Sequence, residues 1–335
     1  MPNSLPIVAV ASLGGTISMT PSSEGGIVPT LDAAQLAQSA PGISGIANLR
    51  AESLRQLPSA SLSFDDLMAV LAWAEKQVED GAHGIVLTQG TDTLEESAFF
   101  LDLYWRYPQP LVLTGAMRGA SAAGADGPAN LLAAVQTAVD AQSVGRGVLV
   151  VMNDTVHEAR WVTKADSLST GAFSSGDGGV AARLVEGTPA YFHPPGSRPA
   201  PIPFPQGVWP KVAIIPASLG DGGELASLAA DNGYASIIVA ATGAGHVSYD
   251  FAERIANLAA HIPVFITTRA ASGSTASKTY GYVGAEMDLI RRGAHMGGWL
   301  SAIKARLLVV ALIAAGVEPG RVGESVSNWC KLRSH

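Results

Sequence analysis

The sequence predicts an α/β fold with a large N-terminal doubly wound sheet domain and a smaller C-terminal α/β domain. Short apolar runs alternate with longer segments of helical periodicity along most of the chain. Small or polar turn residues follow several of the apolar runs directly. Residues 189–210 hold eight prolines between two such alternating patterns. We therefore predict an N-terminal domain over 1–190, a proline-rich linker over 191–210 and a C-terminal domain over 211–335.

Composition excludes several classes of function. The 335 residues are 47% hydrophobic and 15% charged, so the chain can bury a sizeable core and is not disordered. A net charge of −7 without a basic cluster argues against nucleic acid or an anionic membrane as partner. The single cysteine, Cys330, makes no internal disulfide, and no Cys/His cluster has zinc spacing. No apolar run reaches the ~18 residues of a membrane span, and the apolar N-terminus lacks a basic region, so we expect a cytoplasmic protein.

The first strand is predicted over residues 5–13, and Gly14 and Gly15 follow it directly. Two glycines allow a sharp turn and a close approach of a ligand, which would place Thr16 at the carboxyl end of the strand. The alternative is an ordinary Gly-Gly turn. Residues 18–29 are rich in turn formers, so we expect a mobile loop that could act as a lid over Thr16.

A second turn of interest follows the apolar run 84–87 and leads into a predicted helix over 94–105. Thr93 and Glu96 have the spacing of a capping box at the start of that helix. Thr91 and Asp92 would then lie beyond the carboxyl end of the strand, where open α/β sheets bind their ligands. The alternative is an ordinary turn and helix cap.

The remaining elements are predicted from periodicity and turn residues. In the first domain, Ser63 is expected to cap a helix, and Ser59 lies in a turn that follows a strand. The expected ranges are helices 31–39, 64–79 and 126–141, and strands 51–57, 110–114 and 147–152. The second domain is expected to contain strands 211–215, 235–240 and 262–267, helix 249–260, and a last helix 302–315 closed by Gly316.

Two threonines at strand ends, an adjacent aspartate and a later lysine form a coherent candidate site: Thr16, Thr91, Asp92 and Lys164. A threonine hydroxyl is a poor nucleophile until a base takes its proton, and a lysine can act as that base. Asp92 can hold the lysine or bind a substrate ammonium group. Such a site suits acyl transfer from an amide or ester to water.

The chain resembles the bacterial-type L-asparaginase and glutaminase-asparaginase family. The resemblance covers residues 7–166 closely and the C-terminal half more loosely. It is carried by ordered blocks at residues 14–17 (Gly-Gly-Thr-Ile), 90–96 (Gly-Thr-Asp-Thr-Leu-Glu-Glu), 114–118, 125–131, 150–155 and 163–164.

The resemblance implies a role for each matching residue. Thr16 would be the nucleophile that forms an acyl-enzyme. Thr91 would serve the second half of the site, with Lys164 as its base. Asp92 would bind the substrate α-amino group, and Ser59 the α-carboxylate. The family is typically a homotetramer whose active sites lie between the large domain of one subunit and the small domain of a neighbour, and it uses no metal or organic cofactor.

Several positions depart from the family pattern. The lid usually carries a tyrosine that activates the first threonine, whereas residues 18–30 contain none and the matching place is about Gly26. Ala60 stands where the family has Gln or Glu, and His246 where a neighbouring subunit usually offers an asparagine. The family's small-domain glutamate has no clear counterpart in the sequence. One hypothesis is that Tyr280 from a neighbour replaces the lid tyrosine; the alternative is that Tyr280 is a packed aromatic.

The resemblance implies an amidohydrolase that converts L-asparagine to L-aspartate and ammonia through a threonyl intermediate. The departures leave open a related substrate, such as L-glutamine or D-asparagine. A further alternative is a non-hydrolytic small-molecule binding protein on the same fold. Retention of Thr16, Thr91, Asp92 and Lys164 argues against loss of turnover, since a binding protein would need neither both hydroxyls nor the lysine.

Overall fold

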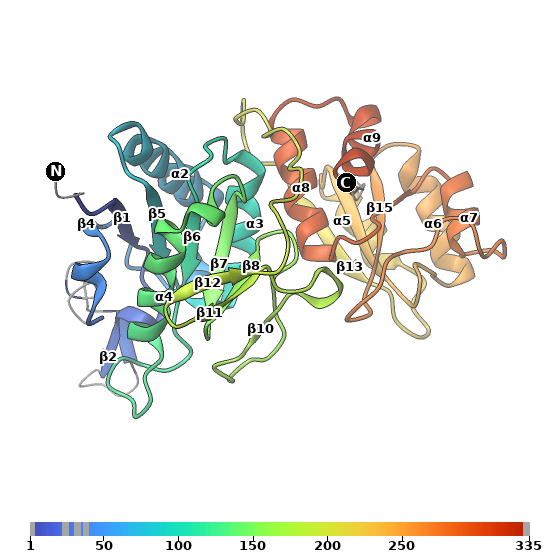
Figure 1. Ribbon diagram of the computed structural model, residues 1–335. Coiled ribbons are helices and arrows are strands. Elements are labelled where there is room, and N and C mark those ends of the chain that lie inside the picture. The colour runs from blue at the N-terminus through green and yellow to red at the C-terminus, as the bar shows by residue number, and fades with distance from the viewer. Residues whose placement is uncertain (1–3, 22–26, 30–34, 36–39, 331–335) are drawn as a thin grey trace. The chain divides into compact units, whose positions relative to one another are not determined.

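The computed structural model describes residues 4–21, 27–29, 35 and 40–330 (Figure 1). The chain divides into two compact units, Met1–Pro201 and Ile202–His335, which are described separately below. The boundary lies inside the proline-rich segment 191–210. Most of the expected helix 31–39, and Gly26 in the expected lid, lie outside the described residues.

Unit 1 is built on an eight-stranded sheet with strand order β12-β11-β8-β7-β6-β5-β1-β4. Strands β4, β1, β5, β6 and β7 run parallel, and the remaining strands pair antiparallel. In chain order the strands are β1 Ile7–Ser12, β4 Asn48–Ser53, β5 Gly84–Thr88, β6 Leu111–Thr114, β7 Val148–Met152, β8 Thr155–Glu158, β11 Ala182–Val185 and β12 Thr188–Tyr191.

Helices cover both faces of the parallel part of this sheet, which confirms a doubly wound arrangement. They are α2 Phe64–Glu79, α3 Leu94–Tyr104 and α4 Gly127–Val139. Alternate residues of the central strands, including Val10, Val86 and Val112, pack with Leu131 and Ala134 of α4 in one buried core. The intervening strand residues are also buried, and α2 and α3 contact the same strands. Because both faces are covered, these strands read as continuous apolar runs.

The sheet is mixed rather than wholly parallel, because the chain reverses after β7. Asn153 and Asp154 both have positive φ, 50° and 55°, and form the two-residue turn that joins β7 to β8. Asn and Asp tolerate this left-handed conformation best among non-glycine residues, and two such residues in succession make a tight hairpin. This Asn-Asp pair is the sequence signal for a hairpin that the parallel-sheet prediction missed.

The two predicted helix caps have different outcomes. Ser63 caps α2 in a full capping box: its hydroxyl accepts from the Asp66 backbone N–H, and the Asp66 carboxylate accepts from the Ser63 backbone N–H. Thr93 precedes α3 but makes no side-chain cap bond, so the capping box with Glu96 is wrong. The Thr93 hydroxyl instead donates to the backbone oxygen of Ser59, at 2.9 Å.

Two short hairpins complete unit 1. The first, β2 Met19–Pro21 with β3 Ile27–Pro29, shows that the expected loop over 18–29 is partly ordered as a β-ribbon. The second, β9 Thr163–Lys164 with β10 Phe173–Ser174, lies beyond β8 and carries the candidate lysine.

Unit 2 holds a four-stranded parallel sheet of order β13-β14-β15-β16, formed by β13 Val212–Pro216, β14 Ser236–Ala241, β15 Val264–Thr268 and β16 His295–Met296. Its helices are α5 Glu224–Asp231, α6 Tyr249–Ala259, α7 Glu286–Arg291, α8 Ala302–Ala314 and α9 Pro319–Cys330. The expectation that α8 is the last helix is wrong, since α9 follows it. Within the described ranges, no helix has the length and apolar character required to cross a membrane.

Candidate active site

Three turns of unit 1 meet at the carboxyl ends of neighbouring strands. After β1, Gly14 and Gly15 both adopt positive φ, 100° and 88°. A Cβ on Gly14 would lie 2.6 Å from the Leu57 backbone oxygen, and one on Gly15 would lie 2.1 Å from the Gly90 backbone nitrogen. Only glycine fits this packing and this backbone conformation. The turn after β1 is therefore held tightly between the segments that lead to Ser59 and Thr91.

Thr16 and Thr91 each begin a 3₁₀ turn just beyond two strands that pair side by side. Ser12 at the end of β1 is in register with Thr88 at the end of β5. The turns span Thr16–Ser18 and Thr91–Thr93. Thr16 is half-buried and Thr91 is buried. Both hydroxyl-bearing residues thus occupy the sheet edge that the sequence predicts for a ligand site.

Lys164 joins this site from the β9–β10 hairpin. Its ammonium nitrogen lies 3.0 Å from Thr91 Oγ1 and 2.7 Å from Asp92 Oδ1. The Lys164 side chain is 13% exposed, whereas that of Asp92 is 74% exposed. The structure therefore brings Thr91, Asp92 and Lys164 together, with the amine shielded and the carboxylate accessible from solvent.

Glu95 fixes the backbone of the lysine and was not predicted as a site residue. Its buried carboxylate accepts a hydrogen bond from the Lys164 backbone N–H through Oε2, at 2.8 Å. Glu95 lies in the first turn of α3, where the helix dipole favours a negative charge. The signal available in the sequence was an acidic residue two positions after the Thr91–Thr93 turn.

Ser59 lies against the turn that precedes Thr91. A Cβ on Gly90 would lie 2.9 Å from Ser59 Oγ, and the Thr93 hydroxyl binds the Ser59 backbone oxygen. Ser59 Oγ is buried and has no hydrogen-bond partner among the described residues. Ala60, next to it, is exposed. The structure thus brings Ser59 to the Thr91 turn.

In unit 2, a glycine-rich turn after β14 presents His246. Thr242 and His246 exchange backbone hydrogen bonds of 3.0 and 2.9 Å, with Gly243 and Gly245 at positive φ between them. His246 Nε2 lies 3.1 Å from Glu286 Oε2, and its Nδ1 lies 3.0 Å from the Tyr282 hydroxyl oxygen. Histidine here is therefore part of an ordered side-chain array.

Glu286 is a buried carboxylate that the sequence analysis did not single out. Oε1 accepts hydrogen bonds from the backbone amides of Thr279 and Tyr280, at 2.8 and 2.6 Å. Burial raises the pKa of Glu286, but these amide bonds and the bond from His246 outweigh it, so the net pKa lies below the ordinary value. The charged form is thus held inside unit 2. Its sequence signal was an acidic residue at the start of a short helix.

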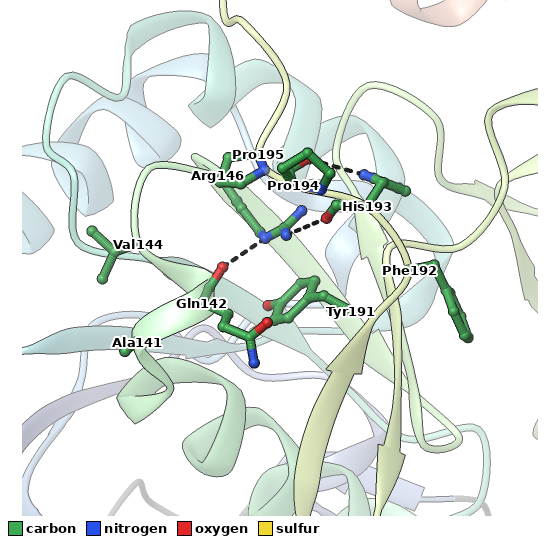
Figure 2. Close-up of a pocket in the computed structure, with 9 residues that line it drawn as sticks. All are labelled: Ala141, Gln142, Val144, Arg146, Tyr191, Phe192, His193, Pro194 and Pro195. Carbon is green, nitrogen blue, oxygen red and sulfur yellow. Dashed lines mark hydrogen bonds between the residues drawn. The ribbon is translucent and has the colours of Figure 1, made fainter.

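The cavity in Figure 2 lies elsewhere in unit 1 and has a different character. It measures about 540 Å³, and Arg146 and Tyr191 line it. Arg146 precedes β7, so this cavity lies at the amino end of the parallel strands, opposite Thr16 and Thr91. The guanidinium donates to the backbone oxygens of Gln142 and His193, at 2.7 and 2.6 Å, and stacks on the Tyr191 ring, 3.8 Å from its centroid. These bonds join two loops, which is a structural role.

Comparison with known proteins places this chain in a family. Residues 7–196 match the family described as Asparaginase, N-terminal, and residues 211–324 match the Glutaminase/Asparaginase C-terminal domain. The chain belongs to the asparaginase family. The family boundary between these matches, like the division into compact units, falls in the proline-rich segment.

Relatives of this asparaginase-family chain span nearly its whole length. It is 36% identical to the probable L-asparaginase of Deinococcus radiodurans, covering 94% of this chain and 95% of that protein. It is 31% identical to L-asparaginase 2 of Escherichia coli, covering 97% and 94% respectively. A probable cytoplasmic L-asparaginase from Campylobacter jejuni has a similar solved structure, with a TM-score of 0.86, 28% identity and coverage of 96% and 99%. The predicted two-unit α/β fold is confirmed.

Proposed function

We propose that this protein hydrolyses the side-chain amide of L-asparagine to L-aspartate and ammonia, through a threonyl acyl-enzyme on Thr16. The observation that carries the proposal is the array of Thr91, Asp92 and Lys164 beside the Gly14–Gly15 turn that leads to Thr16. Family membership and full-length relatives named L-asparaginase support the same reaction.

The reaction needs a nucleophile, a proton acceptor and a later attack by water. The Thr16 oxygen forms a bond to the amide carbon, the carbon–nitrogen bond breaks, and ammonia leaves with the proton it has gained. Water then attacks the ester, which releases L-aspartate and restores the Thr16 hydroxyl. Lys164 is placed to act as the base that accepts the proton of the Thr91 hydroxyl, because its amine nitrogen lies 3.0 Å from that oxygen.

Substrate recognition is assigned to the polar groups around these threonines. The exposed Asp92 carboxylate matches the α-ammonium group of an amino acid. Ser59, against the Thr91 turn, is assigned to the α-carboxylate. Its buried hydroxyl has no hydrogen-bond partner among the described residues, which supports a donor role there. Thr91 is assigned both to catalysis and to substrate contact. These groups bind the α-ammonium and α-carboxylate of the substrate, so the side-chain amide is left to react with Thr16.

Ammonia release tests the proposal directly. The wild-type protein is expected to release ammonia from L-asparagine, and Thr16→Ala is expected to abolish that release. A matched control is Thr188→Ala, which removes an exposed threonine from β12. Release that survives in Thr16→Ala would reject Thr16 as the nucleophile. No release from wild type with any amide would reject hydrolysis.

A second substrate remains a candidate because of two specific positions. Ala60 is exposed beside Ser59 and carries no polar side chain. The resemblance puts His246 at a place where the family usually has an asparagine. Fewer contacts to the amino group would relax the selection of amide length and stereochemistry. Assays with L-glutamine and D-asparagine test this alternative. Saturable binding of L-asparagine without turnover would instead favour a small-molecule binding protein.

The proposal includes a homotetramer and a cytoplasmic location. The Campylobacter protein carries a cytoplasmic title, whereas a Haemophilus influenzae relative, 33% identical, is named periplasmic. Cell fractionation distinguishes the two compartments. Light scattering on the purified protein tests the tetramer, and an active monomer would reject a site shared between subunits.

A further inference from the structure

A buried histidine–serine pair lies at the base of the β9–β10 hairpin that carries Lys164. His157 Nδ1 lies 2.8 Å from Ser175 Oγ, and the two residues are 1% and 3% exposed. His157 belongs to β8, and Ser175 directly follows β10. With so little exposed surface the pair cannot contact a substrate, so it is not a second reaction centre.

The hairpin depends on attachments other than strand pairing. It forms a two-stranded sheet of its own and, in the described part of unit 1, pairs with no strand of the eight-stranded sheet (Figure 1). Lys164 lies opposite Phe173 in the hairpin, so the position of β9 depends on that of β10. Glu95 fixes β9 directly, because its carboxylate accepts from the Lys164 backbone N–H. Strand β10 needs an attachment of its own if the lysine is to keep its place.

His157 supplies an attachment for β10. It lies opposite Val150 in the β7–β8 pair, so its backbone is part of the eight-stranded sheet. Its hydrogen bond to Ser175 joins the end of β10 to that sheet across 18 residues of chain. Beside this bond, Gly178 packs on the indole of Trp161, since a Cβ on Gly178 would lie 2.2 Å from Trp161 Cδ2. The segment that leaves β10 is thus held against the segment that leads into β9.

The hydrogen bond is what a histidine offers at this buried position and an apolar residue does not. His157 Nε2 is buried and has no partner among the described residues, which opposes burial of the ring. Burial lowers the pKa of His157 to about 4, so the ring is uncharged at neutral pH. An uncharged imidazole suits a serine hydroxyl in either tautomer, because the hydroxyl can donate or accept. The favourable polar contact of the ring is therefore the one to Ser175.

We propose that the His157–Ser175 pair is a positioning clamp for Lys164, which holds β10 and, through the hairpin, keeps the amine within reach of Thr91. The inference rests on the proposed hydrolysis and adds two positioning residues to it. Without the bond, β10 is released from the sheet and the amine is free to move away from the Thr91 hydroxyl. A displacement of about 1 Å at a reacting group can lower a rate roughly 10²-fold. The remaining Glu95 anchor limits the loss to about tenfold.

Kinetics of single variants test the clamp. Ser175→Ala removes the hydroxyl and should lower kcat for L-asparagine about tenfold, while KM changes less than about twofold. His157→Asn places an amide at the reach of Nδ1 and should retain most of the rate, whereas His157→Leu should lose as much as Ser175→Ala. Ser167→Ala, an exposed serine of the same hairpin, is the matched control and should keep wild-type kcat. Wild-type kcat in Ser175→Ala, together with an inactive Thr16→Ala, would overturn the clamp and leave the hydrolysis intact.

A double-mutant cycle separates positioning of the lysine from a general structural role. Because the clamp acts through Lys164, Ser175→Ala should cause no further loss of kcat in a Lys164→Met chain. Equal loss in both backgrounds would overturn the clamp. Replacing both partners, as His157→Leu with Ser175→Ala, leaves neither polar group unpaired and should bring the urea midpoint close to that of wild type. The rate of that stable variant should stay low; a wild-type rate would again overturn the clamp.

Hydrogen–deuterium exchange tests the clamp without turnover. Peptides that span 163–174 should exchange about tenfold faster in Ser175→Ala, because the hairpin opens locally more often. Peptides from α2 should exchange at the wild-type rate, which shows that the fold is kept. Wild-type exchange over 163–174 would overturn the clamp, whatever the ammonia assay shows. Faster exchange there, in a protein whose wild type releases no ammonia, would reject the proposed function and retain the clamp on Lys164.

Discussion

The ammonium nitrogen of Lys164 lies 3.0 Å from the hydroxyl oxygen of Thr91, although 73 residues separate them in the chain. The contact exists because the chain reverses after β7 and returns through the β9–β10 hairpin.

Replacing Lys164 by methionine should lower kcat by about 10²- to 10⁴-fold, because a group placed for proton transfer contributes on that order. Methionine keeps most of the side-chain length and apolar stem but cannot bind Thr91 or Asp92. Steady-state kinetics with L-asparagine measure the effect. Lys76→Met is the control, since the Lys76–Asp80 pair is exposed on α2. A Lys164→Met enzyme within twofold of wild type would remove the lysine from the mechanism.

Glu95→Ala should lower kcat about tenfold with little change in KM, because the backbone of Lys164 loses its buried carboxylate anchor. Glu95→Gln keeps an acceptor oxygen at the same reach, so it should recover most of the rate. Equal loss in both variants would mean that the charge of Glu95, and not its acceptor oxygen, matters to the site. Wild-type kcat in Glu95→Ala would rule out a positioning role.

Gly15→Ala should destabilise the protein by about 2–4 kcal/mol, from a positive φ and overpacking together. A Cβ there would lie 2.1 Å from the Gly90 backbone nitrogen, and neither turn can yield without moving the threonine that follows it. Urea unfolding measures the change. Gly45→Ala is the matched control, because no atom lies within 4 Å of its Cβ position and its φ is not in the left-handed region. Comparable stability of the two variants would show that the Gly15 turn is adaptable.

His157 should make stability depend on pH between about 6.5 and 4. Burial lowers the pKa of His157 to about 4, and Arg183 acts in the same direction. The unfolded chain, with an ordinary histidine pKa, therefore binds the proton first as the pH falls. Stability contributed by the neutral imidazole is present above pH 6.5 and is lost toward pH 4, at roughly 1.4 kcal/mol per pH unit.

Urea unfolding at pH 7 and pH 4.5 measures this dependence for wild type and His157→Gln. Glutamine can keep a bond to Ser175, the partner of His157 at 2.8 Å, but does not titrate. The variant should therefore lose less stability on acidification than wild type does. His193→Gln, an exposed histidine of the same unit, should behave like wild type. Parallel pH curves for wild type and His157→Gln would contradict the prediction.

Local sequence patterns predicted most of the helices and strands. The features that were missed depend on contacts between segments that are distant in the sequence. The helix after Ser63 was predicted because propensity, capping and apolar spacing agree over 64–79. The Thr93 cap failed because a nearby backbone oxygen, that of Ser59, competes for the same hydroxyl. The reversal after β7 was missed because an apolar run does not reveal the direction of its neighbour. Helices α5 and α7 were missed because eight- and six-residue segments carry little periodicity.

The residues of the candidate site also fall into a group that the sequence predicted and a group that it did not. Resemblance and strand-end position pointed to Thr91, Asp92 and Lys164, which the fold brings into contact. Glu95 and Glu286 were not predicted, because their importance comes from the backbone amides that they bind and from burial. Neither property can be read from residue type. The lid around Gly26 lies outside the described residues, and its closing motion stays a prediction.

The hydrogen bond from Thr93 to the backbone of Ser59 determines which neighbouring position can change its side chain without disturbing the turn. The Thr93 hydroxyl binds the Ser59 backbone oxygen and so joins the 59–61 turn to the 91–93 turn. Because the acceptor is a backbone atom, the bond does not depend on the side chain at position 60. Ala60 points to solvent and can be exchanged by single mutations without displacing either neighbour. Under the proposed function, substitutions at position 60 can therefore alter substrate selection without breaking the bond between the two turns.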